Sequence, residues 1–245
     1  MTEPAPIFLW QTGGCWGLPS TSPFSIKLEA WLRMNGVPFE IRVLRGRPRS
    51  ANRKIPYIEH PDGRIVGDSG VIMATLREER GLTLDEGLDP RQQAIAIAVT
   101  RMLEDHFYWA IVWDRWFVSE HWPATRQAYF GWLPAPLRGF VPGLLRRAVR
   151  RAFDGQGFGR MPTEQIVTRA RQDLGALAQL LGDGEHMLGR PSSLDATVFA
   201  FVASALWPPF DGPLQRAARE HTNLVALCER TRARWWSLAG PGDLD

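Results

Sequence analysis

The pattern of apolar and polar positions changes character near residue 82. Before it, short apolar runs separated by turn residues predict strands, whereas after it apolar residues recur at helical spacing. We therefore expect an α+β protein with a mixed domain at residues 1–82 and an all-helical domain at residues 83–245. At 245 residues the chain is long enough for each domain to bury its own core.

The first half opens with two predicted strands around one helix. Residues 7–10 form a short apolar run that enters a glycine-containing loop, and helical spacing then begins at Pro23 and stops at residues 35–36, Asn-Gly. Residues 37–44 are typical of a second strand. A basic linker at residues 45–53 follows, with room for a further short helix.

Residues 54–69 predict a β-hairpin that leads into a helix. The apolar runs 55–58 and 64–66 flank a His-Pro-Asp-Gly turn. Pro56 has no N–H to give to a strand ladder, so we expect a special backbone there, such as a cis bond between Ile55 and Pro56. A cis bond would turn the backbone of Ile55 outward, where an extended peptide could pair with it.

A helical pattern begins directly after the hairpin, preceded by Asp68 and Ser69. The free amides at a helix start favour an anion, so this short segment offers both a peptide-pairing edge and a cradle for a carboxylate. An ordinary hairpin followed by an ordinary capped helix explains the same residues. The predicted order β-α-β-(α)-β-β-α is that of thioredoxin, in which Ser22 comes near Ile55 and Ser69.

The second half is predicted to be helical from Pro90 onward. Trp109, Trp113 and Trp116 fall at helical spacing, and such a stripe is more often core than the wall of a substrate site. For His106 we favour a partly buried imidazole with a hydrogen-bond partner over a catalytic one. Residues 122–142 are too interrupted by aromatics and prolines for a long helix.

Pro142 is predicted to open a helix that ends near Phe153 and has one apolar and one arginine-rich face. Attachment to a membrane surface is one interpretation of this pattern. We favour a solvated face on a helix that packs against its own domain, and we do not expect contact with a membrane surface.

The end of the chain is predicted to contain three more helices. Residues 164–181 are amphipathic, and Ser192 and Asp195 form a capping box ahead of a nearly all-apolar helix at residues 195–206. This helix should lie at the centre of the second domain. Residues 223–235 supply the last helix.

Composition narrows the functional classes. The formal net charge is +3 and the arginines cluster at residues 146–151, so a nucleic-acid-binding protein is not indicated. Cys15, Cys228 and the five histidines have no metal-ligand spacing, and we expect no metal. No signal peptide or apolar run of membrane-spanning length is present, which favours a reducing, cytoplasmic location.

Several segments carry a resemblance to a known family. They are residues 22–29, 32–40, 54–60 and 68–69 in the first half and residues 101–110, 192–199 and 223–230 in the second. Together they resemble the glutathione S-transferase superfamily, in particular its metaxin-like branch, which includes the failed-axon-connections proteins and bacterial relatives. The resemblance extends over residues 7–236.

The resemblance implies a thioredoxin-like domain followed by an all-α glutathione-transferase domain, with reduced glutathione as co-substrate. It implies that the Ser22 hydroxyl stabilises the glutathione thiolate, although the same hydroxyl could simply cap the helix at Pro23. The implied glutathione-binding residues are Ser22, Lys54, Ile55, Pro56, Asp68 and Ser69. Ile55 would pair with the cysteinyl unit, Asp68 and Ser69 would hold the γ-glutamyl end, and Lys54 would meet the glycyl carboxylate.

The expected reaction is conjugation of glutathione to a hydrophobic electrophile, as in detoxification. The electrophile would lie against tryptophans such as Trp16, Trp109 or Trp113. Ser22 and Ser25 replace the cysteines of reductase-like relatives, which disfavours thiol-disulfide chemistry, and we expect an unreactive thiol at Cys15.

Two alternatives remain open: a non-catalytic metaxin-like binding or membrane-association module, and a glutathione-dependent enzyme that cleaves ethers or thioethers. The resemblance allows a homodimer, which the insertion at residues 122–160 could alter.

Overall fold

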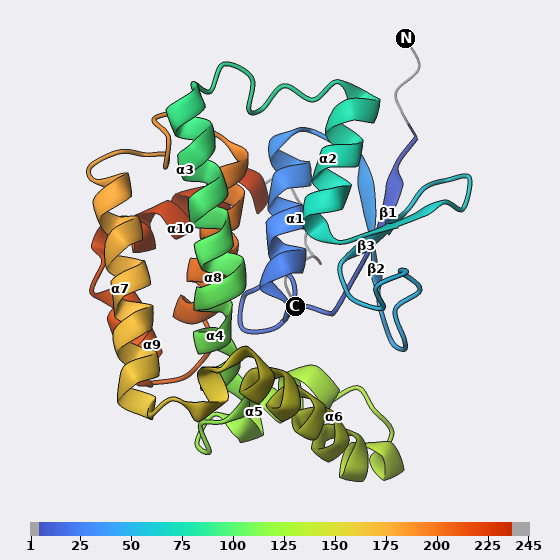
Figure 1. The fold of residues 1–245 in the computed structure, drawn as a ribbon. Coiled ribbons are helices and arrows are strands. Elements are labelled where there is room, and N and C mark those ends of the chain that lie inside the picture. Colours follow the sequence, from blue (N-terminus) through green and yellow to red (C-terminus); the bar gives the residue numbers. More distant parts are fainter. Residues whose placement is uncertain (1–4, 237–245) are drawn as a thin grey trace.

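The computed structural model describes residues 5–236, which form a small sheet with two helices beside a helical domain (Figure 1). The strands are β1 (Ile7–Gln11), β2 (Phe39–Val43), β3 (Tyr57–Glu59) and β4 (Ile65–Gly67). Their order is β2-β1-β3-β4, with β1 parallel to β2 and antiparallel to β3, and β3 antiparallel to β4. The predicted hairpin and thioredoxin-like topology are confirmed.

Helices α1 (Pro23–Met34) and α2 (Ser69–Arg80) cover one face of this sheet. Ile7, Leu9 and Ile58 are fully buried on that face, while Phe8 and Trp10 alternate with them and stay partly exposed. Residues 44–56 contain no helix, so the optional helix between β2 and β3 does not form. This linker is basic and lacks an apolar stripe that could pack on the sheet.

The second domain is built from helices. They are α3 (Pro90–Arg101), the π-helical turn η1 (Met102–Phe107), α4 (Tyr108–Trp116), α5 (Trp122–Phe130), α6 (Ala135–Gln156), the 3₁₀ turn η2 (Phe158–Arg160), α7 (Thr163–Leu181), α8 (Ser193–Leu206), α9 (Pro213–Arg219) and α10 (Thr222–Trp236). Every residue from Leu194 to Leu206 is buried, so α8 is the central helix, as predicted. The backbone N–H of Ser192 donates to the Asp195 carboxylate at 2.9 Å in the predicted capping box.

Helix α6 corrects the prediction for Pro142. The helix begins at Ala135 and Pro142 lies inside it, although proline normally ends a helix because it removes one N–H. The carbonyl that this N–H would have served belongs to Arg138, and the Arg126 guanidinium donates to it at 2.9 Å instead. A side chain from α5 therefore replaces the missing backbone donor and lets the helix continue.

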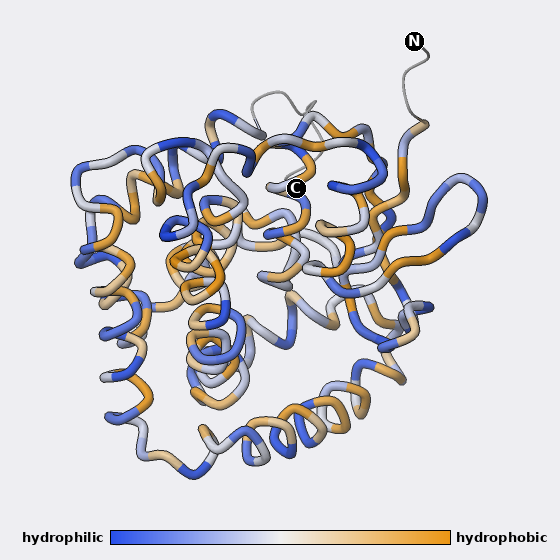
Figure 2. Tube along the Cα trace, turned by 45° about the horizontal axis from the view of Figure 1, so that its top comes forward, coloured by the Kyte–Doolittle hydropathy of each residue, from blue (hydrophilic) through white to orange (hydrophobic). Residues whose placement is uncertain are grey.

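The packing expected for α6 is only partly present. Pro142 and Phe153 are its buried residues, and the apolar side chains on its outer side are exposed. Figure 2 shows apolar and polar segments alternating along this helix at the edge of the molecule. The apolar face that we expected to pack against its own domain is therefore divided between the core and the solvent.

The two halves of the chain are joined by polar contacts from α1. The Lys27 ammonium lies 2.7 Å from the Glu104 carboxylate of η1, and both side chains are almost buried. The Trp31 Nε1–H donates to the Ser193 hydroxyl at the start of α8 at 2.8 Å. These contacts hold the sheet domain against α8 and η1. The domain boundary at residues 82/83 stays a prediction.

Candidate functional site

Three of the predicted site segments meet at one edge of the sheet. Tyr57 pairs with Trp10 on one side and with Gly67 on the other. Because β3 is antiparallel to both neighbours, its amino end lies beside the carboxyl ends of β1 and β4. The segments that continue from these ends contain Ile55 before β3, Asp68 after β4 and the loop that leads from β1 to α1.

The bond between Ile55 and Pro56 is cis, as predicted. Within the part of the chain that the structure describes, the backbone N–H and C=O of Ile55 make no hydrogen bond. Ile55 is half-buried. Its backbone is therefore open to a ligand that brings a donor and an acceptor of its own, as an extended peptide does.

Lys54 is held in place by Ser50. The Ser50 hydroxyl accepts from the Lys54 N–H at 3.1 Å and donates to the Lys54 carbonyl at 2.7 Å. Ser50 also lies against Gly67, where an added Cβ would come within 2.7 Å of the Ser50 Cβ. The absence of a side chain at Gly67 therefore lets the Lys54 segment approach the end of β4.

Asp68 and Ser69 form the start of α2. One oxygen of the Asp68 carboxylate accepts from the backbone N–H groups of Gly70 at 2.9 Å and Val71 at 3.2 Å. Asp68 has a φ of 75°, in the left-handed region that few residues other than glycine adopt. Ser69 is buried beside it. The carboxylate caps the helix with one oxygen, and its other oxygen has no partner among the described residues.

Ser22 precedes α1, but its side chain makes no capping hydrogen bond. The Ser22 hydroxyl therefore does not cap the helix, and it has no hydrogen-bond partner among residues 5–236. The neighbouring residue is firmly anchored, because the Thr21 N–H donates to the Thr12 hydroxyl at 3.2 Å and its carbonyl accepts from Arg115 at 2.7 Å. Thr12 directly follows β1, so these contacts keep the start of α1 near the sheet edge.

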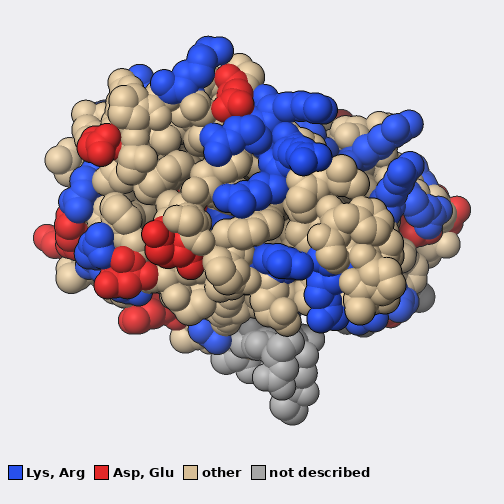
Figure 3. Space-filling model, turned by 90° about the horizontal axis from the view of Figure 1, so that it is seen from below, with Lys and Arg blue, Asp and Glu red and all other residues tan. Residues whose placement is uncertain are grey.

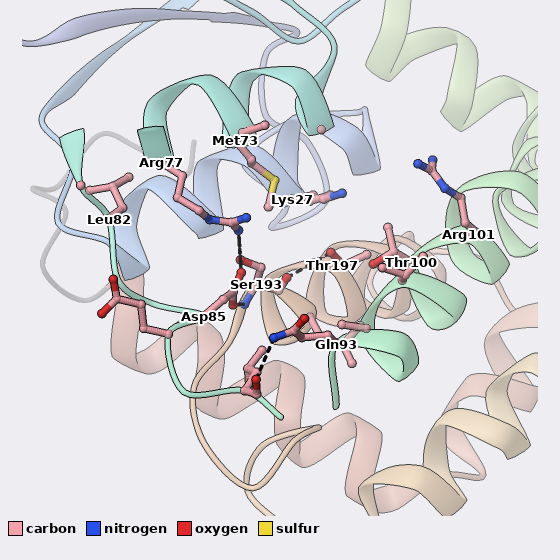
Figure 4. Close-up of a pocket in the computed structure, with 18 residues that line it drawn as sticks. Lys27, Met73, Arg77, Leu82, Asp85, Gln93, Thr100, Arg101, Ser193 and Thr197 are labelled. Atoms are coloured by element: carbon pink, nitrogen blue, oxygen red, sulfur yellow. Dashed lines mark hydrogen bonds and ion pairs between the residues drawn. The ribbon is translucent and has the colours of Figure 1, made fainter. Parts of the chain in front are cut away.

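A cleft of about 670 Å³ opens beside the start of α2 and extends between α2, α3 and α8 (Figure 4). Two of its charged side chains, Arg77 and Asp85, are paired with each other. Arg77 meets Asp85 at 2.6 Å, and Asp85 also accepts from the Ser193 backbone N–H at 2.8 Å. This network ties the segment between α2 and α3 to the start of α8, so it serves the contact between the domains.

A second cavity of about 500 Å³ lies next to the anchored Thr21. The loop after β1, the end of β2 and helix α5 line it, with Trp16, Tyr129 and Trp132 as aromatic walls. Trp132 is exposed and Trp16 packs edge-on against Phe210 at 5.3 Å between ring centroids. A pocket of this size with aromatic walls and a few polar groups suits a small molecule.

The other two predicted tryptophans lie elsewhere. Trp113 is buried in the helical core, and Trp109 packs against Tyr108 and Phe153. Neither lines the two cavities described above, and their place in a substrate site stays a prediction. Trp132 and Tyr129 were not predicted, although the aromatic-rich run from residue 122 was the available signal.

Cys15 lines the second cavity and is free. Burial raises the pKa of its thiol to about 11, although the charge of Arg115 lowers it. A thiol with such a pKa is almost wholly protonated at neutral pH and is a poor nucleophile. Among the described residues no group of three or more His, Cys, Asp and Glu side chains could hold a metal ion.

No helix among residues 5–236 is both long enough and apolar enough to cross a membrane.

Comparison with known proteins agrees with this geometry. The glutathione S-transferase N-terminal domain family matches residues 23–122, and the C-terminal domain family matches residues 170–231. The chain is 30% identical to the isoprene-epoxide–glutathione S-transferase of Rhodococcus sp. (strain AD45), over 90% of this chain and 95% of that protein. It is 29% identical to metaxin-1 of Macaca fascicularis, over 93% of this chain and 74% of that protein.

Solved structures share the fold. A glutathione S-transferase of Methylobacterium radiotolerans in complex with glutathione sulfonate aligns with a TM-score of 0.58 and 19% identity, covering 94% of this chain and 92% of its own. The sheet topology, the two family domains and the similarity to the Rhodococcus enzyme and metaxin-1 agree, and the chain belongs to the glutathione S-transferase family, in its metaxin-like branch.

Proposed function

We propose that the protein binds reduced glutathione at the sheet edge and conjugates it to a small hydrophobic electrophile. The observation that carries the proposal is that the backbone of Ile55 makes no hydrogen bond among the described residues. It lies on the same sheet edge as the start of α2 and as the Ser22 hydroxyl, which does not cap α1. Each feature complements one part of the tripeptide. Together they offer a main-chain partner, a hydrogen-bond donor for sulfur and a helix start for a carboxylate.

In this proposal the tripeptide lies extended along the edge. The N–H and C=O of Ile55 pair with its cysteinyl unit, while Asp68 and Ser69 hold the γ-glutamyl end at the mouth of α2. The second Asp68 oxygen accepts from the α-amino group. The Ser69 N–H, which is not bonded to the Asp68 carboxylate, faces the α-carboxylate. The Lys54 ammonium reaches the glycyl carboxylate.

The Ser22 hydroxyl donates a hydrogen bond to the glutathione sulfur. This contact favours the thiolate, which is the nucleophile, over the thiol. The electrophile occupies the cavity beyond Thr21, against Trp16 and Trp132. For an epoxide, the sulfur lone pair forms a C–S bond as the C–O bond of the ring breaks, and the resulting alkoxide takes a proton from water.

The similarity to a transferase named for isoprene epoxide supports an epoxide as the first electrophile to test. Calorimetric titration with reduced glutathione comes first, because it asks whether the tripeptide site is functional. Conjugation of isoprene epoxide and of a chromogenic aromatic halide follows with wild type, Ser22→Ala and Ser25→Ala. Ser25 is a matched control because its hydroxyl lies one turn further along α1 and is buried without a hydrogen-bond partner.

We expect Ser22→Ala to lower kcat by about 10- to 100-fold while the affinity for glutathione changes little. Ser25→Ala should leave both nearly unchanged. Equal rates for Ser22→Ala and wild type would contradict the role of the serine, and no heat of glutathione binding would contradict the site itself.

Two further results would redirect the proposal. Glutathione binding without conjugation of either electrophile would favour a non-catalytic module, which the similarity to metaxin-1 supports. Release of a phenol from an aromatic ether at the expense of glutathione would favour ether cleavage. We also propose a homodimer, for which light scattering of the purified protein is the measurement.

A further inference from the structure

The outer face of α6 exposes an unusual concentration of apolar side chains. Five of the nine exposed large hydrophobic residues in the described part of the chain lie between residues 132 and 145. On α6 itself Leu137, Phe140 and Leu144 are 39%, 54% and 57% exposed. Their spacing of three and four residues aligns them in one stripe, on the side of the helix opposite the buried Pro142 and Phe153.

The same stripe continues as arginines. Arg147 and Arg151 follow Leu144 at the next steps of three and four residues, and both are exposed. Neither forms an ion pair with any residue from 5 to 236. The helix therefore presents one outward line that is apolar in its first half and cationic in its second.

Two other arginines, Arg146 and Arg150, lie nearer the inner side of α6 than this line does. The Arg146 guanidinium lies over the Trp122 ring at 4.6 Å, and that of Arg150 lies over the Phe117 ring at 3.9 Å. Helix α6 contains five arginines and a single acidic residue, Asp154. Figure 3 views the molecule from the side on which α6 lies in Figure 1 and shows Lys and Arg gathered over this face, with acidic side chains mainly toward one edge.

The outer face of α6 combines exposed apolar side chains with arginines that have no ion pair among the described residues. A lipid bilayer matches this combination better than a protein surface does. Lipid bilayers place acyl chains directly beneath anionic phosphates, so they satisfy both halves of the line at once. A second copy of this chain would bring arginines against arginines whenever the two helices lay parallel. The position of α6 along the outside of the molecule leaves its outer side accessible to a flat surface (Figure 1).

We propose that the outer face of α6, formed by Leu137, Phe140, Leu144, Arg147 and Arg151, docks on the surface of an anionic phospholipid bilayer. The apolar half of the line enters the boundary between headgroups and acyl chains, and the two arginines contact lipid phosphates. The helix lies on the membrane and does not cross it. This proposal departs from our sequence-based expectation and is independent of the glutathione site.

The test is co-sedimentation of the purified protein with vesicles. One set contains phosphatidylcholine alone, and the other contains phosphatidylcholine mixed with phosphatidylserine, each at low and at high salt. Two double variants are compared. Phe140→Ser with Leu144→Ser removes the apolar half of the line, and Arg147→Glu with Arg151→Glu removes its cationic half. Leu180→Ser on α7 and Arg91→Glu on α3 are matched controls, since both residues are exposed and lie away from α6.

We expect wild type to bind the phosphatidylserine vesicles and release them at high salt, because salt screens the contact with phosphates. Each double variant should weaken binding by about tenfold or more, while the controls bind as wild type does. Thermal unfolding of every variant establishes that the fold is retained, which is expected because all four substituted side chains of α6 are exposed.

Two results would overturn the proposal. The first is no binding to phosphatidylserine vesicles at low salt, or equal binding by wild type and both double variants. The second is a wild-type dimer that becomes a monomer in Phe140→Ser with Leu144→Ser, without any lipid binding by wild type. That outcome would assign the stripe to an interface between two copies of the chain.

Discussion

The Nη1 atom of Arg115 donates a hydrogen bond of 2.7 Å to the carbonyl oxygen of Thr21, 94 positions earlier in the chain. Arg115 is buried, and its other hydrogen-bond partners are the Ser204 carbonyl at 2.8 Å and the Tyr129 hydroxyl at 3.1 Å. It forms no ion pair with any described carboxylate. A buried cation in α4 thus fixes the residue that directly precedes Ser22.

Replacing Arg115 should therefore affect both stability and the candidate site. We expect Arg115→Met to lower the free energy of unfolding by about 2 to 4 kcal/mol, because hydrogen bonds from a charged donor are strong and the Ser204 carbonyl loses its partner. Conjugation by the folded variant should also slow, since Thr21 is held less firmly. Urea denaturation and steady-state kinetics are the measurements.

Tyr129→Phe is the matched control for Arg115. The Tyr129 hydroxyl donates to the same Thr21 carbonyl at 3.1 Å and accepts from Arg115 at 3.1 Å, so this variant removes both bonds but leaves the arginine bound to the two carbonyls. We expect a loss of about 1 to 2 kcal/mol, since each such bond has a net value of about 1 kcal/mol. A Tyr129→Phe variant as unstable as Arg115→Met would contradict the central role of the guanidinium.

Substitutions of Asp68 separate helix capping from glutathione binding. Asp68→Ala should lower stability by about 1 kcal/mol, because two amides of α2 lose their acceptor and alanine tolerates a positive φ poorly. Asp68→Asn keeps the acceptor and tolerates this conformation, so its stability should stay near that of wild type. Both variants lose the negative charge, and calorimetry should show weaker glutathione binding by both.

The Arg126 guanidinium and Pro142 should be energetically coupled through the Arg138 carbonyl. Arg126→Met leaves that carbonyl without a donor in the wild-type helix. In a Pro142→Ala background the new backbone N–H of residue 142 can donate to the Arg138 carbonyl. Arg126→Met should therefore lower the free energy of unfolding by less in this background than in wild type. We expect a coupling of about 0.5 to 1.5 kcal/mol in a double-mutant cycle of urea denaturation. Strictly additive effects would show that the arginine does not replace the missing donor.

The pair of His121 and Asp114 predicts a dependence of stability on pH. Burial lowers the pKa of His121, but the hydrogen bonds and the charge of Asp114 raise it by more than burial lowers it. The pKa of His121 therefore lies above its ordinary value of 6.5. The folded state then binds the proton more tightly than the unfolded state. This stabilisation is complete below the unfolded pKa and is lost as pH rises through the raised folded pKa.

We therefore expect His121→Gln to destabilise the protein more at about pH 5.5 than at about pH 8.5. Urea denaturation of both proteins at the two pH values measures the difference. His121 also stacks on Phe210 with 4.2 Å between ring centroids, which adds a loss of packing that does not depend on pH. If the free energies of unfolding of wild type and His121→Gln differed by the same amount at both pH values, the protonation of His121 would contribute nothing and only its packing on Phe210 would matter.

The thiol of Cys15 should react slowly with iodoacetamide at neutral pH. Its pKa is raised to about 11 by burial, and burial also raises that of Cys228. Mass spectrometry should show little modification of the native protein at pH 7, faster modification of Cys15 as pH rises, and rapid modification of both residues in urea. Fast labelling of native Cys15 at pH 7 would contradict this.

Local chemistry allowed the sequence to predict most of the sheet domain. Proline and glycine act on their own backbone and that of their neighbours, so the turn before Gly63, with its φ of 87°, and the cis bond before Pro56 could be predicted from short segments. The buried helix α8 was equally clear, because a nearly continuous apolar run with a capping box leaves few alternatives.

Local rules failed where a distant side chain changed the result. Pro142 lies inside a helix because the Arg126 guanidinium donates to the Arg138 carbonyl. The π-helical turn at Met102–Phe107 was not predicted either. Its side chains make contacts with distant residues, including Glu104 with Lys27 and His106 with Asp173 at 2.6 Å.

The sequence alone determined the order of the elements along the first domain, the hairpin, the central helix and the family resemblance, because these depend on periodicity and on residues close together in the chain. Only the tertiary structure decided which aromatic residues line a cavity, which hydroxyl lacks a partner and which side of α6 meets solvent. Those properties depend on contacts between residues far apart in sequence, such as Arg115 and Thr21, and no local pattern encodes them.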